Sequence, residues 1–255
     1  MKNSSVNIVP IKNGLNFRDL GGIQTRDGRR IRSGKLFRSG DFSRLNEDDK
    51  QILAHQIGIK HILDYRDQSE IAKFPDNLWQ NSQYHNIPAN PIKTELTADL
   101  QDIELLLQLK KDLPAKFMTE LYRLLPFNNS AYKKLVDLLL NTNGESVVQH
   151  CAVGKDRTGI GVALTLFALN VDEETIMQDY LATETLLHDF KVAMFEQDNK
   201  KLAYKEVFSA DPDYLSAALD EIKKRYQNID TWLAKEYQLN DKNRIKMQDF
   251  YLESD

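Results

Sequence analysis

The most constraining feature of this 255-residue chain is a short apolar segment that runs directly into a loop and then into a second apolar segment. The first segment is Ser146–Gln149, and the loop reads His150-Cys151-Ala-Val-Gly-Lys-Asp-Arg157-Thr158-Gly. Residues 158–169 are apolar almost all round, which is typical of a buried helix. This order predicts an α/β core in which a strand, a loop and the N-terminus of a buried helix follow one another.

The predicted loop has the composition of an anion-binding site. The first N–H groups of a helix have no partner within it, and the helix dipole is positive at that end. Five residues separate Cys151 from Arg157, so their N–H groups can surround a tetrahedral anion. Arg157 can then close the ring with a bidentate contact. We therefore expect substrate-binding positions at Ala152, Val153, Gly154 and Lys155.

Cys151, the only cysteine of the chain, is placed to act as a nucleophile. The helix dipole, the loop amides, Arg157 and His150 would all stabilise a thiolate, and such settings lower a cysteine pKa from about 8.5 to roughly 3.5–7.5. Attack on a phosphate monoester would give a cysteinyl-phosphate, which water hydrolyses. The Thr158 hydroxyl can assist by bonding to the sulfur. A lone cysteine is otherwise a buried apolar residue, but the spacing to Arg157 favours the nucleophile.

Composition excludes several other classes. A single cysteine leaves no disulfide framework and no cysteine-rich zinc site. The formal charge of −4 argues against a nucleic-acid partner, and no apolar run has the length of a transmembrane helix. The N-terminus lacks a signal-peptide pattern. We expect a cytoplasmic protein, with secretion left open if an export signal was removed.

Periodicity along the chain alternates strands with helices, and we expect one domain over residues 1–255. A turn at Asp27-Gly28 predicts a hairpin. Further strands are expected at 36–39, 60–64, 84–88 and 146–149. Helices are expected at 46–58, in two or three pieces over 97–140 broken near Pro114 and Pro126, and at 158–169, 172–200, 211–226, 229–237 and 241–252.

One local cluster of basic residues stands out against the acidic average. It has two interpretations, a solvated hairpin face or a surface that attracts anionic substrates. Its members are Arg26, Arg29, Arg30, Arg32, Lys35 and Arg38.

The loop resembles the signature of the cysteine-dependent tyrosine phosphatases, which is His-Cys, five residues, Arg, then Ser or Thr. With Lys155 and Asp156 inside the loop, it is most similar to bacterial members such as the secreted phosphatases of Listeria and Mycobacterium. Departures from the family pattern occur at Tyr65, where Leu is usual, and at Thr183-Glu184. Other matching segments are 16–22, 37–39, 64–70, 176–181 and 214–219 with Tyr226, Ile229 and Leu233.

The resemblance implies a tyrosine-phosphatase-like fold, with a central, mostly parallel sheet flanked by helices and no metal or organic cofactor. It implies substrates among phosphotyrosine, phosphoserine or phosphothreonine proteins and phosphoinositides. Lys155 would add positive charge at the pocket floor, and Asp156 could be the general acid. The additional helices over 97–125 and 182–207 could form a lid, or could simply cover the core.

Several roles stay open at this stage. The general acid is Asp156 by the resemblance, with Asp64, Asp67 and Asp76 as alternatives, and Asp64 could instead form an internal ion pair with Arg66. A second group, Arg18 and Asp19, either orients the loop or pins the N-terminal segment. His150 is expected to hold the cysteine backbone and tune the thiolate. Alternatives to a phosphatase are a non-catalytic phosphate-binding module and a rhodanese-like or arsenate-reducing enzyme.

Overall fold

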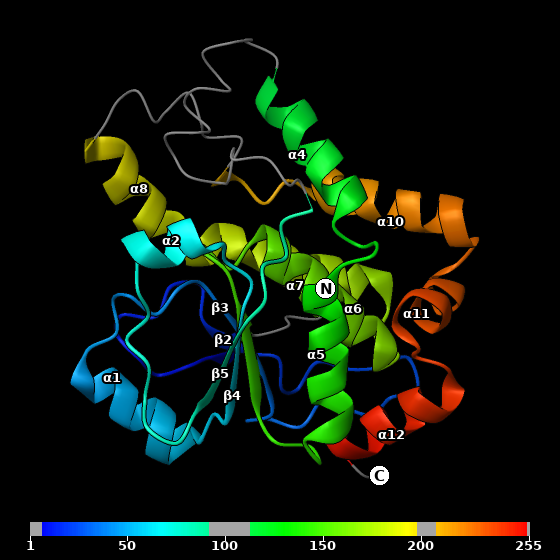
Figure 1. The fold of residues 1–255 in the computed structure, drawn as a ribbon, viewed down its shortest axis with the longest axis horizontal. Helices are drawn as coiled ribbons and strands as arrows, with labels where there is room; N and C mark the ends of the chain where they lie inside the picture. The colour runs from blue at the N-terminus through cyan, green and yellow to red at the C-terminus, as the bar shows by residue number, and fades with distance from the viewer. Residues whose placement is uncertain (1–6, 92–112, 198–207, 254–255) are drawn as a thin grey trace.

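A computed structural model describes residues 7–91, 113–197 and 208–253. Its centre is a six-stranded sheet with the order β1-β2-β3-β6-β4-β5 (Figure 1). The four strands from β3 to β5 are parallel, and the two at the β1 edge pair antiparallel. The expected α/β class with a mostly parallel sheet is thus confirmed. The strands are β1 (Asn7–Ile8), β2 (Arg18–Asp19), β3 (Leu36–Ser39), β4 (His61–Asp64), β5 (Gln83–Asn86) and β6 (Val147–His150).

The register of the parallel strands determines where the cysteine loop lies. His150 at the end of β6 is level with Ser39 at the end of β3 and with Asp64 at the end of β4. All three strands therefore deliver their carboxyl ends to one edge of the sheet, where ligands bind in open α/β folds. The loop after β6 begins at this edge.

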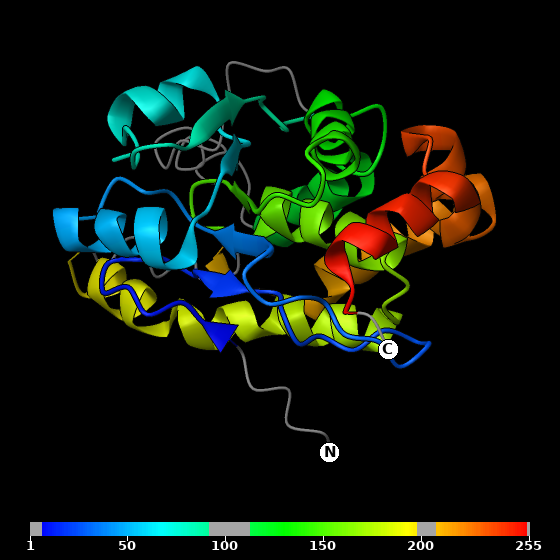
Figure 2. The same ribbon diagram turned by 90° about the horizontal axis from the view of Figure 1, so that it is seen from below.

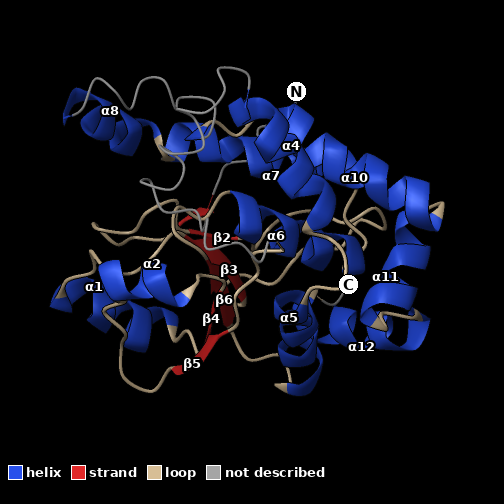
Figure 3. Cartoon of the chain, turned by 45° about the horizontal axis from the view of Figure 1, so that its top comes forward, coloured by secondary structure: helices blue, strands red, loops and turns tan. Residues whose placement is uncertain are grey.

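Helices cover both faces of the sheet, because successive strand residues point to opposite faces. Leu36, Leu63 and Val147 belong to the larger apolar core. Their neighbours on the same strands, such as Phe37 and Val148, belong to a smaller core with Phe42 and Trp79. Figure 3 shows the sheet with helices α1 (Glu47–Gln51) and α2 (Gln68–Lys73) on one side and helices α5 (Ser130–Asn141) and α6 (Asp156–Ala168) on the other.

The helices between strands follow the expected order. The first begins at a capping box made by Asn46 and Asp49, continues as a π-helix, and ends where Gly58 adopts a φ of 73°. The helix after the cysteine loop begins at Asp156, two residues earlier than expected. The bounds are α1 (Glu47–Gln51), η1 (Ile52–Ile57), α2 (Gln68–Lys73), α4 (Leu113–Leu124), α5 (Ser130–Asn141) and α6 (Asp156–Ala168).

The C-terminal part is helical, as expected, and its helices begin at side-chain caps. Asp172, Asp211, Asn228 and Asn240 each accept a bond from a backbone N–H of the following turn. The helix predicted over 172–200 is instead two helices separated at Leu187. Figure 2 places the C-terminal helix far from α1, across the sheet. The bounds are α7 (Glu173–Leu186), α8 (His188–Gln197), α10 (Pro212–Tyr226), α11 (Ile229–Tyr237) and α12 (Asp241–Tyr251).

The predicted lid is only partly described, because residues 92–112 and 198–207 lie outside the described ranges. Helices α4 and α8 are the described parts of the two predicted lid segments. Among the described residues, no helix combines the length and apolar character needed to cross a membrane.

The basic cluster does not form one surface. Gly28 makes the predicted turn with a φ of 92°, and Arg29 pairs with Asp27. Other members bind backbone carbonyls elsewhere: Arg32 donates to Leu252 O and Lys35 to Gly144 O. The cluster therefore fastens the hairpin to the rest of the fold, and its sixth member, Arg38, is buried in the site described below.

Candidate active site

The cysteine loop is tightly seated between β6 and α6. Cys151 follows β6 directly and is buried. Within the loop, Gly154 has a φ of 68°, and a Cβ added there would lie 2.3 Å from the Ser39 carbonyl oxygen. Only glycine fits both the left-handed conformation and the close approach. The loop is also tied at Ala152, whose carbonyl accepts the Asp41 N–H at 3.0 Å.

A buried group of four residues holds the loop from the β3 side, and we call it the loop clamp: Asn16, Arg18, Arg38 and Asp179. Asn16 Nδ2 donates to the carbonyls of Val153 and Gly154 at 3.1 and 2.9 Å. Arg38 also donates to Gly154 O, at 2.7 Å. These bonds occupy the loop carbonyls on the outside, which leaves the loop N–H groups free to face inward.

Asp179 of α7 joins the two arginines of the loop clamp. Its carboxylate pairs with Arg18 Nε at 2.8 Å and with Arg38 Nη1 at 2.5 Å. Although burial alone would raise it, the pKa of Asp179 is lowered by the two guanidinium groups. Arg18 in turn donates to Asn16 Oδ1 at 2.6 Å and so orients the amide that holds the loop. Of its two expected roles, the contacts of Arg18 fit loop orientation.

The arginine of the loop is itself held by a carboxylate. Arg157 Nη1 and Nη2 donate to the two oxygens of Glu70 in α2, at 2.6 and 2.7 Å. Burial lowers the pKa of Arg157, but Glu70, with smaller contributions from Cys151 and Asp67, raises it well above its ordinary value. The guanidinium is therefore fixed in orientation and stays charged beside the sulfur.

The hydroxyl of Thr158 is the other polar group beside the loop. It lies in the first turn of α6 and is fully buried. Within the described part of the chain, Thr158 Oγ1 has no hydrogen-bond partner. A buried hydroxyl without a partner costs about 1–3 kcal/mol; the expected bond of Thr158 to the sulfur stays a prediction.

The side chain of Lys155 contacts both Asp156 and a residue outside the loop. Lys155 is fully buried, and its Nζ donates to Ser209 O at 2.9 Å. The same ammonium lies 3.0 Å from Asp156 Oδ1 and 5.8 Å from the centre of the Tyr214 ring. It is thus directed toward α10 and the acid, and does not lie open at the pocket floor as the resemblance implied.

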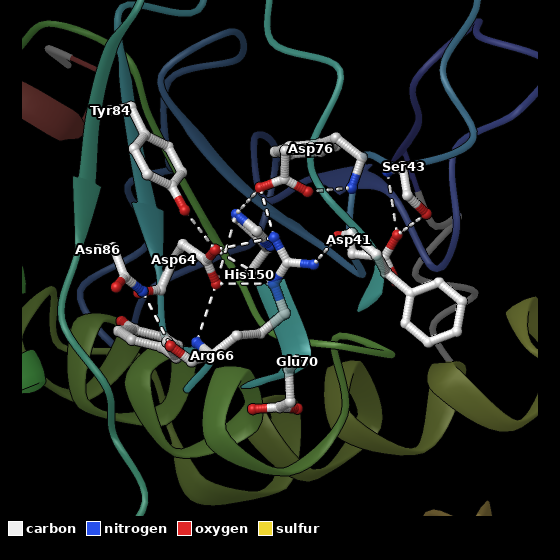
Figure 4. A network of polar contacts seen from close by, with 12 residues as sticks. Asp41, Ser43, Asp64, Arg66, Glu70, Asp76, Tyr84, Asn86 and His150 are labelled. Atoms are coloured by element: carbon white, nitrogen blue, oxygen red, sulfur yellow. Dashed lines mark hydrogen bonds and ion pairs between the residues drawn. The ribbon is translucent and has the colours of Figure 1, made fainter. Parts of the chain in front are cut away.

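On the β4 side of the loop lies a second buried group, which we call the acid cluster: Asp64, Arg66, Asp76 and His150. Figure 4 shows the Arg66 guanidinium between the two carboxylates, with Arg66 Nη2 at 2.9 Å from Asp64 and 2.7 Å from Asp76. Tyr84 also donates to Asp64, at 2.7 Å. Asp64 therefore forms the internal ion pair that was its alternative interpretation.

His150 belongs to this acid cluster by its side chain. Its Nε2 lies 3.4 Å from Asp76 and 3.8 Å from Asp64, and its ring contacts Phe42 at 4.6 Å between centroids. Its carbonyl accepts the Tyr65 N–H at 2.9 Å. The ring points into the acid cluster, so we assign it no direct contact with the thiol.

The acid cluster is also the place where a cation could be considered. Among described residues, the ligand atoms of Asp64, Asp76 and His150 form one group within 4.8 Å. The Arg66 guanidinium already bonds both carboxylates, so it supplies the positive charge that a metal would bring.

The carboxyl groups near the loop differ in their suitability as a proton donor. The pKa of Asp64 is lowered, because His150 and Arg66 outweigh burial. Burial raises the pKa of Asp67, which caps α2 and lies in the electrostatic range of Arg157. Burial also raises the pKa of Asp76, but that group is tied to Arg66. Asp67 is therefore the main rival of Asp156.

Asp19 lies outside this arrangement. Its two carboxylate oxygens accept the backbone N–H groups of Gly21 and Gly34, at 2.8 and 2.7 Å. It braces the N-terminal hairpin, which fits the second of its two expected roles.

The departure at Tyr65 has a local explanation. Tyr65 is fully buried, and its hydroxyl donates to Gln149 Oε1 at 2.9 Å. Its ring meets Tyr132 edge-on, and the Tyr132 hydroxyl donates to Arg157 O at 2.8 Å. The larger side chain thus forms part of the support beneath α6.

Sequence reasoning missed several residues that the structure brings to the loop. Glu70, Asn16 and Asp179 lie in the segments that resemble the family, so that resemblance was an available signal. Arg38 lies in the matching segment 37–39, but a role was considered for it only as part of the basic cluster. Tyr122 of α4, which donates to Asp156 Oδ1 at 2.7 Å, lies in no matched segment and left no signal.

The fold agrees with comparisons to known proteins. A family model described as "Tyrosine phosphatase family" matches residues 9–253. A candidate tyrosine-protein phosphatase of Cupriavidus necator is 32% identical over 65% of this chain and 59% of its own length. The triple specificity protein phosphatase PtpB of Mycobacterium tuberculosis is 27% identical over 86% of this chain and 90% of its own length.

A third relative, a tyrosine-protein phosphatase of Nostoc commune, is 30% identical over 59% of this chain. The alignments with the Cupriavidus and Nostoc proteins span 59% and 48% of those proteins. The family match, in contrast, includes strands β2 to β6, the cysteine loop and the C-terminal helices. The chain belongs to the tyrosine phosphatase family.

Proposed function

We propose that this protein hydrolyses phosphate monoesters, foremost phosphotyrosine in proteins, through a cysteinyl-phosphate intermediate. The observation that carries the proposal is the seat of Cys151. Its thiol lies between the end of β6 and the N-terminus of α6, beside a guanidinium that Glu70 holds with two bonds. This is an anion site with a nucleophile at its centre.

In the first step, the loop N–H groups and Arg157 bind the phosphoryl oxygens. The Cys151 thiolate attacks phosphorus, and the P–O bond to the leaving group breaks as the S–P bond forms. Donors fixed in advance stabilise the charge that develops on the phosphoryl oxygens. We assign the proton that reaches the leaving oxygen to Asp156, whose side chain is 19% exposed and so can meet a substrate.

In the second step, water attacks phosphorus and the S–P bond breaks, so that its electron pair returns to the sulfur. Asp156, now ionised, accepts the proton from the water. The Thr158 hydroxyl, which lacks another partner in the described part of the chain, can turn toward the sulfur and stabilise the departing thiolate. It would then be satisfied only during turnover.

Substrate breadth is a separate part of the proposal. The name of the Mycobacterium relative describes a triple specificity phosphatase, which supports phosphoserine and phosphothreonine as further substrates here. The burial of Lys155 against Ser209 gives less support to a phosphoinositide head group at the pocket floor. A direct comparison of the three phosphopeptides with phosphoinositide vesicles decides this point.

The test of the mechanism is hydrolysis of para-nitrophenyl phosphate by the wild type and Cys151→Ser. We expect loss of activity in Cys151→Ser, inhibition of the wild type by vanadate, and no loss in EDTA. Substantial activity of Cys151→Ser would overturn the cysteine mechanism. Abolition of the wild-type activity by EDTA would overturn it as well. Phosphate binding without turnover by the wild type would instead favour a binding module.

A further inference from the structure

Helix α4 brings a buried hydroxyl to the acid of the loop. Tyr122 is fully buried, and its hydroxyl donates to Asp156 Oδ1 at 2.7 Å. The Tyr122 hydroxyl oxygen also lies 2.9 Å from the hydroxyl oxygen of Tyr180 in α7. We propose that Tyr122 is a positioning residue, which holds the Asp156 carboxyl group toward the substrate and, paired with Tyr180, supports it in both protonation states. This inference rests on the proposed role of Asp156.

The two hydroxyl groups can reverse their direction, because either oxygen of the pair can be the donor. When Asp156 is ionised, Tyr122 donates to it and Tyr180 donates to Tyr122. When Asp156 is protonated, it can donate to Tyr122, whose own proton then turns toward Tyr180. A residue that gives a proton in one step and takes one back in the next needs such an adaptable partner.

Neither tyrosine competes with Asp156 for the proton that is transferred. Burial and the neighbouring Asp156 carboxylate raise the pKa of Tyr122 and of Tyr180 well above the ordinary value. Both hydroxyl groups therefore stay protonated over the working range of the enzyme. They orient and bond to the carboxyl group, while the proton moves between Asp156 and the leaving group or water.

The charged and titratable surroundings of Asp156 come from several elements. Lys155 of the loop pairs with the same oxygen as Tyr122. On the α10 side, the Tyr214 ring lies against both Tyr122, at 5.7 Å between centroids, and the Lys155 ammonium. The Arg38 guanidinium of β3 interacts electrostatically with Tyr180.

The test compares Tyr122→Phe with a matched control, Tyr237→Phe. Tyr237 is also a buried tyrosine, and its hydroxyl donates to Pro126 O at 2.8 Å, in α11 and away from the loop. Both variants keep the ring; Tyr237→Phe loses its buried hydrogen bond to Pro126, and Tyr122→Phe loses those to Asp156 and Tyr180. Circular dichroism and urea unfolding of both variants establish that they are folded.

The readout is kcat/KM, which reports the first step alone, for two aryl phosphates, phenyl phosphate with a poor leaving group and 2,4-dinitrophenyl phosphate with a good one. For Asp156→Asn we expect a fall of about 100-fold with phenyl phosphate and little change with the dinitrophenyl ester. For Tyr122→Phe we expect about a 3- to 10-fold fall, the equivalent of one hydrogen bond. It should occur with phenyl phosphate alone.

The outcomes distinguish the proposed role of Tyr122 from the proposed role of Asp156. If Tyr122→Phe affects both esters equally, or behaves like Tyr237→Phe with the two esters, the positioning role of Tyr122 is wrong. Asp156 then remains the proposed acid. If Asp156→Asn itself shows no dependence on the leaving group, the acid assignment fails and the role of Tyr122 fails with it. Asp67→Asn in the same assay then identifies whether the rival carboxyl group is the donor.

Discussion

Two buried ionic groups flank the end of β6, and they contrast in charge and in what they hold. The loop clamp has two guanidinium groups around one carboxylate, and it bonds the carbonyls of the cysteine loop. The acid cluster has two carboxylates around one guanidinium, and it holds the ends of β4 and the neighbouring loops. The positive excess lies where an anion is to bind, and the negative excess lies behind it.

The contrast extends to the direction of the pKa shifts. The pKa of Asp179 in the loop clamp is lowered, because Arg18 and Arg38 outweigh burial. The pKa of Asp76 in the acid cluster is raised, because burial outweighs its partners. The ionised form of Asp179 is thus stabilised by its surroundings, whereas burial destabilises the ionised form of Asp76. Loss of the first should therefore cost much more than loss of the second.

The largest expected effect is that of Asp179→Ala. Removal of this carboxylate leaves two buried guanidinium groups without their partner, and the free energy of unfolding should fall by about 3–5 kcal/mol. Urea unfolding measures it. Asp230→Ala is the control, because Asp230 also pairs with an arginine but is 73% exposed, and it should cost less than about 1 kcal/mol. Equal losses in the two variants would contradict the account.

Gly154→Ala should follow in size. The strain of a left-handed alanine costs about 1–2 kcal/mol, and the close contact of the new Cβ with Ser39 adds to it. Because the loop must shift, kcat should fall as well. Gly28→Ala is the control, since its φ is also positive at 92° but nothing lies within 4 Å of the added Cβ. It should show the strain alone and retain activity.

Tyr84→Phe probes the acid cluster more gently. The variant removes the hydrogen bond to Asp64, and Tyr84 is 36% exposed. We expect a loss of about 1 kcal/mol in the free energy of unfolding, with kcat for para-nitrophenyl phosphate preserved. A collapse of activity would show that the acid cluster acts on the loop directly.

Asp76→Asn should have the smallest effect at neutral pH, and its pH dependence should be opposite to that of Asp179→Asn. With a raised pKa, the contribution of Asp76 to stability is present at low pH and is lost as pH rises through its folded-state pKa. Because its pKa is lowered, the contribution of Asp179 to stability is present above its unfolded-state pKa and is lost as pH falls through its folded-state pKa. Urea unfolding between neutral and acidic pH measures both; parallel trends would refute the contrast.

The fold was accessible from sequence where a local pattern decides structure. Apolar runs located β3, β4 and β6, and the buried character of 158–169 located α6. The two-residue strands β1 and β2 carry no such pattern, because they form only by pairing at the sheet edge, β2 with β3 and β1 with β2. The break at Leu187 also left no glycine or proline to mark it.

The site was accessible only along the loop itself. The spacing of Cys151 and Arg157 indicates an anion site, but their partners come from distant segments. Glu70 lies 87 residues from Arg157, and Asp179 lies 161 residues from Arg18. A sequence displays such charges without their pairing. For the same reason Lys155 was expected at the pocket floor, while in the structure it binds a carbonyl 54 residues away.

The central claim is that phosphorus becomes bonded to Cys151 during turnover. Rapid quenching of the wild type with an aryl phosphate, followed by mass spectrometry of the digested protein, tests it directly. The account predicts the added mass of one phosphoryl group on the peptide that contains Cys151, and its absence in Cys151→Ser. A phosphoryl group on any other residue, or turnover without one on Cys151, would contradict it.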